Sequence, residues 1–171
     1  MVLPKNSGLQ EYKKEFEKLE NEKIIVRAED VPLFVELIKQ KGKNCIGLTG
    51  EDLFEEYSLN KKTSLEIVQT IPWNDSTTLF GKPTLCLLGN KEKELSNSTI
   101  AVNKKYSKIT KNYFKEKQPK QIIYFSGCTE EAFDAKITDF VVDIVYSGES
   151  AKEVGLEIID KLFESNVVVI R

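Results

Sequence analysis

The sequence predicts an α/β protein with mainly parallel sheets. Its 171 residues are 40% apolar and 30% charged, an ordinary balance for a globular chain long enough to bury a substantial core. The last third alternates between short apolar strands and helices, a pattern typical of parallel sheets with covered faces. The elements predicted there are strand Gln121–Phe125, helix Thr129–Ala135, strand Phe140–Val145, helix Ala151–Glu164 and strand Val167–Ile170.

The first part of the chain contributes further helices and strands. Apolar residues recur at steps of three and four from Leu9 to Leu19, and they predict an amphipathic helix over Gly8–Glu22. A second helix begins after Asp30 and closes at Gly42, since these are ordinary start and stop residues of helices. The remaining predictions are strands Lys23–Arg27, Asn44–Leu48 and Leu65–Thr70, and a helix that opens at Thr49–Asp52.

A polar, irregular stretch separates two parts of the chain. Ile71–Pro83 contains two prolines, a tryptophan and a glycine, so we expect a connection there. Residues 1–83 and 165–171 are predicted to form lobe I, and residues 84–164 lobe II. The first elements predicted beyond this connection are strands Thr84–Leu88 and Thr99–Val102 and helix Tyr106–Lys117.

Composition excludes several classes of function. The chain has no histidine, so histidine-dependent nucleophiles, His-ligated zinc and a histidine general base are excluded. A net charge of −2 gives no broad basic surface, and we expect no nucleic-acid partner. The apolar runs are too short to cross a bilayer, no signal peptide is visible and the three cysteines are scattered. We therefore expect a cytoplasmic protein without membrane association.

The best-marked candidate site is the turn after the strand Phe140–Val145. Asp143 is the only charged residue in that apolar strand, where an acid is costly unless it is paired or lies near a ligand. The following Ser147–Ser150 combines a glycine, which permits a left-handed turn, with two hydroxyls and a helix N-terminus. This pattern is typical of a turn that binds a phosphate. Asp143 would then lie beside ribose hydroxyls or Mg²⁺.

The same residues also fit a turn that binds nothing. Ser150 and Glu153 form a capping box, which any helix can use. Asp143 can likewise accept backbone hydrogen bonds at a loop. From these residues alone both interpretations stay open.

Motifs along nearly the whole chain favour the interpretation that this turn binds a phosphate. Gly127–Glu130 and Ile137–Ser150 match G-S-x-E followed by D-x-I-V-D-x-V-x-T-G-x-T-L. The other matching segments are Leu3–Lys5 with L-P-K, Val26–Pro32 with R-x-x-D-I-P, Ile46–Leu53 with G-I-T-G-x-D-x-L, Leu79–Gly81 with F-G-x-C-R, and Ile100–Phe114 with I-A-T-x-Y-P-x-I-T-x-x-Y-F. In this order the motifs resemble ATP phosphoribosyltransferase, the first enzyme of histidine biosynthesis.

The resemblance implies a fold, a reaction and a cofactor. The fold would be that of the type II periplasmic binding proteins, with two α/β lobes and a cleft between them. The adenine N1 atom of ATP would displace pyrophosphate from phosphoribosyl pyrophosphate, with Mg²⁺ on the leaving group. Such a transfer needs no protein nucleophile, which suits a chain without histidine.

The resemblance also assigns roles to residues. Ser147, Gly148, Glu149 and Ser150 would bind the 5′-phosphate. Asp139 and Asp143 would be the catalytic acids on the ribose side, with Asp143 toward the metal, and Glu130 would lie at the edge of the cleft. Lys5, Arg27, Thr49 and Gly50 are the candidates for substrate binding in lobe I. Alternatively, Thr49 and Asp52 serve only as a helix cap, which is the more common role of such residues.

Several positions depart from the family pattern. The arginine of F-G-x-C-R falls on Thr84, the arginine of the opening motif is missing, and the acid before the T-G becomes Tyr146. Room for a strand pair is missing before Arg27, and we expect neither the family's closing helix nor its regulatory domain. The phosphoribosyl pocket is therefore better preserved than the ATP pocket. Candidates to replace the lost charge are Lys5, Arg27, Lys82 and Lys104.

Two functional hypotheses follow. The chain is a short-form catalytic subunit, working as a homo-oligomer or with a regulatory subunit that resembles histidyl-tRNA synthetase. Alternatively, it is a non-catalytic or regulatory paralogue that binds a phosphorylated small molecule. The lost arginines favour the second hypothesis, and the loop and the order of the motifs favour the first.

Overall fold

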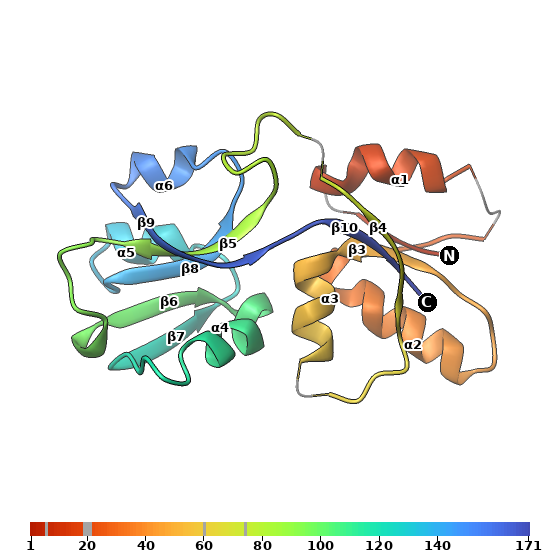
Figure 1. The fold of residues 1–171 in the computed structure, drawn as a ribbon, viewed down its shortest axis with the longest axis horizontal. Helices are drawn as coiled ribbons and strands as arrows, with labels where there is room; N and C mark the ends of the chain where they lie inside the picture. The colour runs from red at the N-terminus through yellow and green to blue at the C-terminus, as the bar shows by residue number, and fades with distance from the viewer. Residues whose placement is uncertain (6, 19–21, 60, 74) are drawn as a thin grey trace. The chain divides into compact units, whose positions relative to one another are not determined.

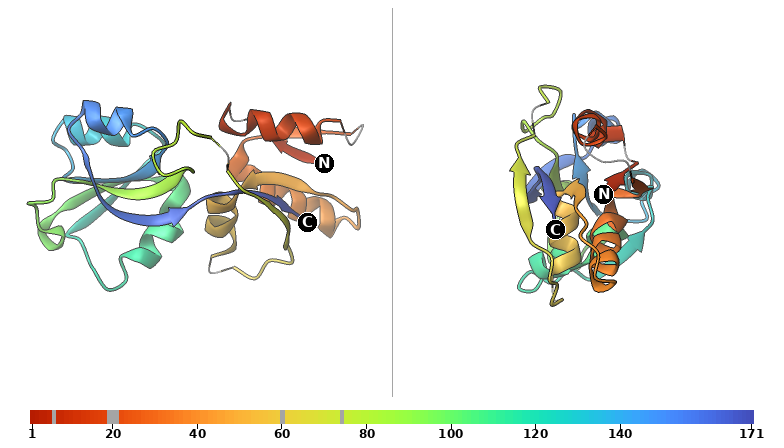
Figure 2. Two further views of the ribbon diagram at one scale, coloured as in Figure 1. Left: turned by 45° about the horizontal axis from the view of Figure 1, so that its top comes forward. Right: turned by 90° about the vertical axis from the view of Figure 1, so that its right-hand side faces the viewer.

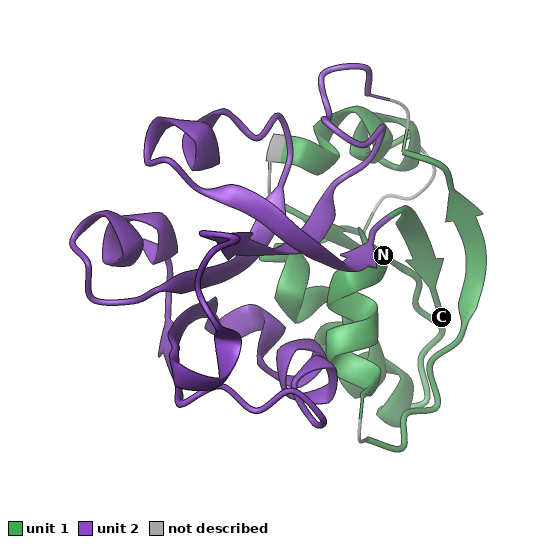
Figure 3. Cartoon of the chain, turned by 60° about the vertical axis from the view of Figure 1, so that its left-hand side comes forward, with its two compact units in different colours: residues 1–73, 166–171 green, residues 74–165 purple. Residues whose placement is uncertain are grey.

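The chain forms two compact units (Figure 3). The computed structural model describes residues 1–5, 7–18, 22–59, 61–73 and 75–171. The first unit comprises Met1–Trp73 and Asn166–Arg171, and the second comprises Asn74–Ser165. The division falls inside the stretch predicted as irregular, and residues 74–83 group with the second unit rather than with lobe I.

The first unit is a five-stranded mixed sheet with helices (Figure 1). The strand order is β2-β1-β3-β10-β4. β1 is parallel to β2 and β3, whereas β10 is antiparallel to β3 and β4. The strands are β1 (Val2–Pro4), β2 (Ile24–Val26), β3 (Gly47–Gly50), β4 (Ile67–Ile71) and β10 (Val167–Ile170), and the α-helices are α1 (Gln10–Phe16), α2 (Val31–Gln40) and α3 (Glu51–Ser58).

Close packing of α2 holds this unit together. α2 packs on β1 and β3, and Val31 and Val35 of this helix are fully buried. A Cβ atom at Gly47 would lie 2.6 Å from a methyl carbon of Val35, so only glycine lets the helix approach β3 this closely. α1 lies on the other side of the sheet (Figure 2). There the Tyr12 ring packs against the Trp73 ring at an angle of 45°, with ring centroids 5.4 Å apart.

The second unit is also a five-stranded mixed sheet, with the order β7-β6-β8-β5-β9. β6 is parallel to β7 and β8, whereas β5 is antiparallel to β8 and β9. Its strands are β5 (Thr84–Gly89), β6 (Thr99–Asn103), β7 (Gln121–Phe125), β8 (Phe140–Val145) and β9 (Glu157–Glu164), and its α-helices are α4 (Ser107–Tyr113), α5 (Thr129–Asp134) and α6 (Glu149–Glu153).

Alternate residues of the central strands face opposite sides of this second sheet. Leu88 and Val141 belong to a buried cluster with Ala132 of α5 and Ala151 of α6. Their sequence neighbours Leu87 and Phe140 face the other side, on which α4 packs against β6 and β9. Short 3₁₀ turns complete the structure at Ser7–Leu9, Ala28–Asp30, Leu95–Asn97 and Lys104–Tyr106.

The predicted helix Ala151–Glu164 is wrong. α6 ends at Glu153, Gly155 adopts a φ of +74°, and the Leu156 N–H donates to the Ala151 carbonyl at 2.8 Å. This is a glycine helix cap, and it turns the chain back into β9. The apolar pairs of β9 are spaced so that they also fit a helix, and only pairing with β5 decides for a strand. β10 in the first sheet and β5 in the second run antiparallel to both of their neighbours, so each sheet is mixed.

Smaller differences concern helix ends. The helix predicted over Gly8–Glu22 is a 3₁₀ turn followed by α1, which ends at Phe16, and residues 19–21 lie outside the described part. α4 ends at Tyr113, before the predicted Lys117. Among the described residues, no helix is long and apolar enough to cross a membrane.

Candidate functional site

The turn after β8 has the conformation expected of a phosphate loop, the name used below for Ser147–Ser150. Gly148 has a φ of +77°, which L side chains rarely adopt, and it precedes the first residue of α6. The Glu149 N–H donates to the Ser147 hydroxyl oxygen at 3.3 Å. Because a hydroxyl carries its own hydrogen as well as lone pairs, Ser147 can still donate to a ligand.

A small cavity of about 140 Å³ opens at this loop. It brings Glu130, at the start of α5, together with Ser147, Gly148 and Ser150. Glu149 is not among the lining residues, so its side chain is not part of the observed cavity. Four residues that the sequence assigned to one site therefore meet in the second unit.

Asp143 is held beside this region by side chains from neighbouring elements. The Thr129 hydroxyl donates to Asp143 Oδ2 at 2.7 Å, and the Ile144 N–H donates to Oδ1 at 2.8 Å. The Asn103 amide lies 3.3 and 3.4 Å from the two oxygens. Asp143 therefore accepts hydrogen bonds from side chains as well as from the backbone.

Sequence reasoning missed Asn103 and gave Thr129 no role. Asn103 is the last residue of β6, which is parallel to β8, so both strands carry polar side chains toward the same edge. A polar residue directly after the apolar run Ile100–Val102 was the available signal. The Lys105 N–H also donates to Asn103 Oδ1 at 3.4 Å, which leaves the amide nitrogen to face Asp143.

Glu130 is a partly buried carboxyl group that lies close to other negative charges. Burial raises the pKa of this carboxyl, and the negative charges of Asp143, Glu131 and Glu153 raise it further. A raised pKa at the edge of an anion site reduces the repulsion that Glu130 exerts on a bound phosphate. Such shifts occur at functional sites, although structural clusters produce them too.

The protein supplies only part of the ligands that a Mg²⁺ ion would need in this region. Among the described residues, no group of three or more acidic, cysteine or histidine side chains is placed to hold a metal ion. Asp143 is one carboxylate whose bonds to Asn103 are long enough to be given up. This donor set suits Mg²⁺, which keeps several waters and is commonly bound by one or two carboxylates and substrate phosphates.

The structure does not bring Asp139 to the phosphate loop. It precedes β8, four residues before Asp143, so roughly 13 Å of extended strand separates them. The Thr99 N–H donates to its carboxylate at 2.9 Å and Lys93 forms an ion pair with it. These contacts, with Lys93 foremost, lower its pKa. Asp139 therefore joins β6, β8 and the loop after β5, and it does not line the cavity of Glu130 and Ser147.

The candidates in the first unit have different environments. Lys5 and Arg27 follow the parallel strands β1 and β2, and the Lys5 N–H donates to the Val26 carbonyl at 2.8 Å. The Arg27 side chain is 67% exposed, and its guanidinium lies 4.0 Å from the Glu29 carboxylate. These two cations therefore lie at the same edge of the first sheet. Lys82 and Lys104 belong to the second unit, and neither lines the loop cavity.

Thr49 and Gly50 are structural in this chain. Thr49 is fully buried and its hydroxyl donates to the Ala28 carbonyl at 2.9 Å, so it ties β3 to the turn before α2. Gly50 precedes α3 with a φ of −74°, which any residue adopts. In this structure the hydroxyl hydrogen of Thr49 is therefore committed to Ala28 and is not offered to a substrate.

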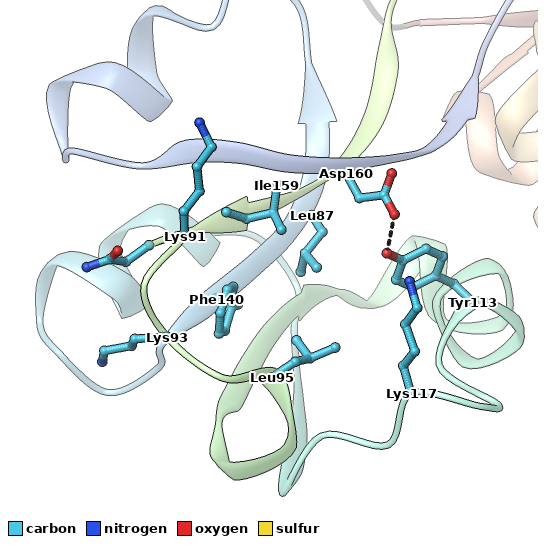
Figure 4. A pocket seen from close by; sticks show the side chains of 10 residues that line it. Leu87, Lys91, Lys93, Leu95, Tyr113, Lys117, Phe140, Ile159 and Asp160 are labelled. Atoms are coloured by element: carbon cyan, nitrogen blue, oxygen red, sulfur yellow. Dashed lines mark hydrogen bonds between the residues drawn. The ribbon is translucent and has the colours of Figure 1, made fainter.

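A separate cavity of about 270 Å³ lies on the α4 side of the second sheet (Figure 4). Leu87 and Phe140 line it, and the Tyr113 hydroxyl donates to Asp160 at 2.6 Å. In Figure 4 two lysines extend away from this apolar floor. Lys91 pairs with Glu157 and Lys93 pairs with Asp139. A third lysine at this cavity, Lys117, lies over the Tyr113 ring, 5.3 Å from its centroid.

Two α/β units, each a mixed sheet with helices, define a two-lobed α/β fold of the kind found in periplasmic binding proteins. The aliphatic sulphonate binding protein SsuA of Escherichia coli shares this fold, with a TM-score of 0.57 and 13% identity over 99% of this chain and 62% of that chain. The family described as "HisG: ATP phosphoribosyltransferase" matches residues 27–171. The chain belongs to the ATP phosphoribosyltransferase family.

Individual relatives agree with this membership. The chain is 31% identical over 148 residues to an ATP phosphoribosyltransferase of Aquifex aeolicus, covering 85% of this chain and 63% of the relative. For that of Thermococcus gammatolerans the identity is 32% over 150 residues, covering 84% and 64%. The chain thus spans less than two thirds of the length of these relatives.

A solved structure shares more of the fold. It is the ATP phosphoribosyl transferase (HisG:HisZ) complex of Thermotoga maritima, with a TM-score of 0.75 and 28% identity, covering 99% of this chain and 85% of that chain. The two-unit α/β architecture predicted from the sequence is confirmed by this likeness.

Proposed function

We propose that this chain transfers the phosphoribosyl group of phosphoribosyl pyrophosphate to N1 of the adenine of ATP, with release of pyrophosphate. This is the first step of histidine biosynthesis. The observation that carries the proposal is the cavity in which Glu130, Ser147, Gly148 and Ser150 meet. Membership of the family, whose description names this activity, supports it.

The phosphate loop would bind the 5′-phosphate of the ribose. The left-handed Gly148 lets successive backbone N–H groups point to one side, and a glycine there leaves room for close approach of the ligand. The hydroxyls of Ser147 and Ser150 add donors at the same cavity. Hydrogen bonds to a charged group are worth about 1.5–3 kcal/mol each, enough to fix one end of the substrate.

Asp143 would orient the ribose. Its carboxylate is fixed by Thr129 and faces the same edge of the sheet as Asn103, so it can accept from ribose hydroxyls without reorganising. Asp143 is also the residue that would hold Mg²⁺, together with substrate oxygens and water. When bound, the ion supplies positive charge for the leaving pyrophosphate.

The transfer then depends on position rather than on a protein nucleophile. Displacement at an anomeric carbon passes through a state that resembles an oxocarbenium ion, as in glycoside hydrolysis. The protein must hold the adenine nitrogen near that carbon and exclude water. Lys5 and Arg27 of the first unit are the cations that we propose for the ATP polyphosphate.

The partners and the location are part of the proposal. The relative from Thermotoga maritima was solved as a HisG:HisZ complex. We therefore propose that this chain works in the cytoplasm as an oligomer, alone or with a regulatory subunit of the histidyl-tRNA-synthetase type. Neither partner nor location changes the chemistry assigned to the phosphate loop.

One observation favours the non-catalytic alternative. Thr84, at the family's arginine position, is fully buried, and its hydroxyl donates to the Lys82 carbonyl at 3.2 Å. No charge is available there for a polyphosphate. In this alternative the chain binds phosphoribosyl pyrophosphate but does not turn it over.

A pyrophosphate-release assay separates the two functions. The chain is given phosphoribosyl pyrophosphate, ATP and Mg²⁺, with and without a regulatory subunit, while calorimetry measures binding of each substrate. Turnover that needs both substrates supports the transferase. Binding of phosphoribosyl pyrophosphate without turnover in either assay supports the alternative, and absence of binding contradicts both.

A further inference from the structure

A short turn packs against the back of the phosphate loop. The Thr78 hydroxyl donates to the Asp75 carbonyl at 2.7 Å, and the Gly81 N–H donates to the Thr78 carbonyl at 3.2 Å. Phe80 packs against the buried cluster beneath α5 and α6. The turn is therefore held by its own hydrogen bonds and anchored to the core of the second unit.

Leu79 is the residue of this turn that touches the loop. Its N–H donates to the Tyr146 carbonyl at 2.7 Å, directly before Ser147. A Cβ atom built on Gly148 would lie 3.1 Å from Leu79 Cδ2, tighter than ordinary van der Waals contact. Leu79 and Gly148 also line one side of an apolar cavity of about 350 Å³. One residue thus fixes the loop through its backbone and through its side chain.

The exposure of Leu79 indicates that its contact with the loop does more than fill the hydrophobic core. Its side chain is 43% exposed, so it adds little to the buried apolar area. Its backbone bond ends at the carbonyl that leads into the loop, and its methyl group lies against the left-handed residue. A shift of Gly148 would turn the N–H groups that follow it away from the cavity.

We propose that Leu79 is a positioning residue for the phosphate loop: it holds Gly148 in the left-handed conformation in which the loop binds a phosphoryl group. The inference rests on the proposed function. Leu79 touches neither substrate, and it acts by limiting the orientations available to the loop. Its removal should therefore weaken binding at the loop and leave the ATP side unaffected.

The test compares variants by calorimetry with phosphoribosyl pyrophosphate and Mg²⁺, and separately with ATP. Leu79→Ala is expected to weaken phosphoribosyl pyrophosphate binding about tenfold, since a misplaced contact group costs one to two orders of magnitude. Leu79→Met, which keeps a long apolar side chain against Gly148, retains wild-type affinity, and both variants keep the backbone N–H. Affinity for ATP is unchanged in both. Ile137→Ala is the matched control, because Ile137 is 60% exposed in the same unit and lies outside the loop cavity.

A second comparison measures the contact without a ligand. Gly148→Ala is made in the wild type and in Leu79→Ala, and thermal unfolding of each is followed. The added methyl group should lower the melting temperature less in the Leu79→Ala background, where the neighbouring Cδ2 atom is gone.

Two results overturn the inference: Leu79→Ala that binds phosphoribosyl pyrophosphate within twofold of the wild type, or equal effects of Gly148→Ala in both backgrounds. Failure of the wild type to bind phosphoribosyl pyrophosphate contradicts the proposed function instead. The unfolding comparison then still decides whether Leu79 and Gly148 are coupled.

Discussion

A buried carboxylate in the first unit allows a quantitative test of the structure. Glu36 of α2 is 7% exposed, and it accepts hydrogen bonds from the Tyr57 hydroxyl, the Lys61 ammonium at 2.7 Å and the Thr63 hydroxyl at 2.8 Å. The Lys61 hydrogen bond is the largest cause that lowers the pKa of Glu36 from 4.5 to about 2. We predict that Glu36→Gln destabilises the first unit at neutral pH.

The magnitude follows from the two pKa values. The difference between 4.5 and about 2 corresponds to roughly 3 kcal/mol of native-state stabilisation. The Lys61 side chain is 39% exposed, so solvent screens the pair, and glutamine keeps part of the hydrogen bonding. We therefore expect Glu36→Gln to lower the free energy of unfolding by about 1–2 kcal/mol at pH 7.

The pH dependence has a definite sign. Because the folded pKa of Glu36 lies below the unfolded value, its contribution is complete above about pH 5 and is lost as the pH falls toward 2. Chemical unfolding of the wild type and of Glu36→Gln, measured from pH 7 to pH 3, should show the two converging in acid.

The matched control is Glu66→Gln, which removes an exposed ion pair with Arg171 at 2.7 Å. Exposed pairs contribute little, so this variant should behave like the wild type at pH 7. The reasoning is refuted if Glu36→Gln is as harmless at pH 7 as Glu66→Gln, or if its effect is equally large at pH 3.

Three predictions concern the proposed site. Gly148→Val should abolish phosphoribosyl pyrophosphate binding in calorimetry, because a β-branched residue opposes a φ of +77°, whereas Gly42→Ala, at a φ of +72° in the first unit, should strain the backbone without changing affinity. Glu130→Gln should tighten binding at neutral pH, and wild-type affinity should approach that of the variant as the pH falls through the raised pKa of Glu130; a persistent gap in acid would contradict this. Asp143→Asn should abolish pyrophosphate release, whereas Asp139→Asn should lower the melting temperature and leave substrate affinity intact, and the reverse ranking would restore Asp139 to the site.

The sequence was sufficient to locate the loop because its signals are local. A glycine that must turn left, its flanking hydroxyls and the apolar strand before it lie within eleven residues of chain, Phe140–Ser150, and the structure agrees with this part of the prediction. Reliance on local signals also led to the wrong prediction of a helix over Glu157–Glu164, which forms β9. There the apolar pattern suits both a helix and a strand, and the partner that decides is β5, far away in sequence.

The remaining site residues depended on contacts that spacing does not encode. Asn103 becomes relevant because β6 and β8 are parallel neighbours, and Leu79 because its turn folds back on Tyr146. Asp139 shares a motif with Asp143, yet four residues of extended strand place them apart. Thr49 fits the motif by residue type, but burial against Ala28 uses its hydroxyl. Motif position is thus a good guide to a strand and a poor guide to what each side chain contacts.

The segment from β5 to β9 begins and ends at adjacent points, since the Ser165 N–H donates to the Pro83 carbonyl at 2.9 Å. A segment with its two ends side by side can be removed, replaced or joined into a ring without stretching the backbone. In sequence, the second unit, which carries the proposed phosphate loop, is one segment inserted between the two parts of the first unit. Exchange of the segment between relatives would show whether the ligand specificity that we propose for the phosphate loop moves with it.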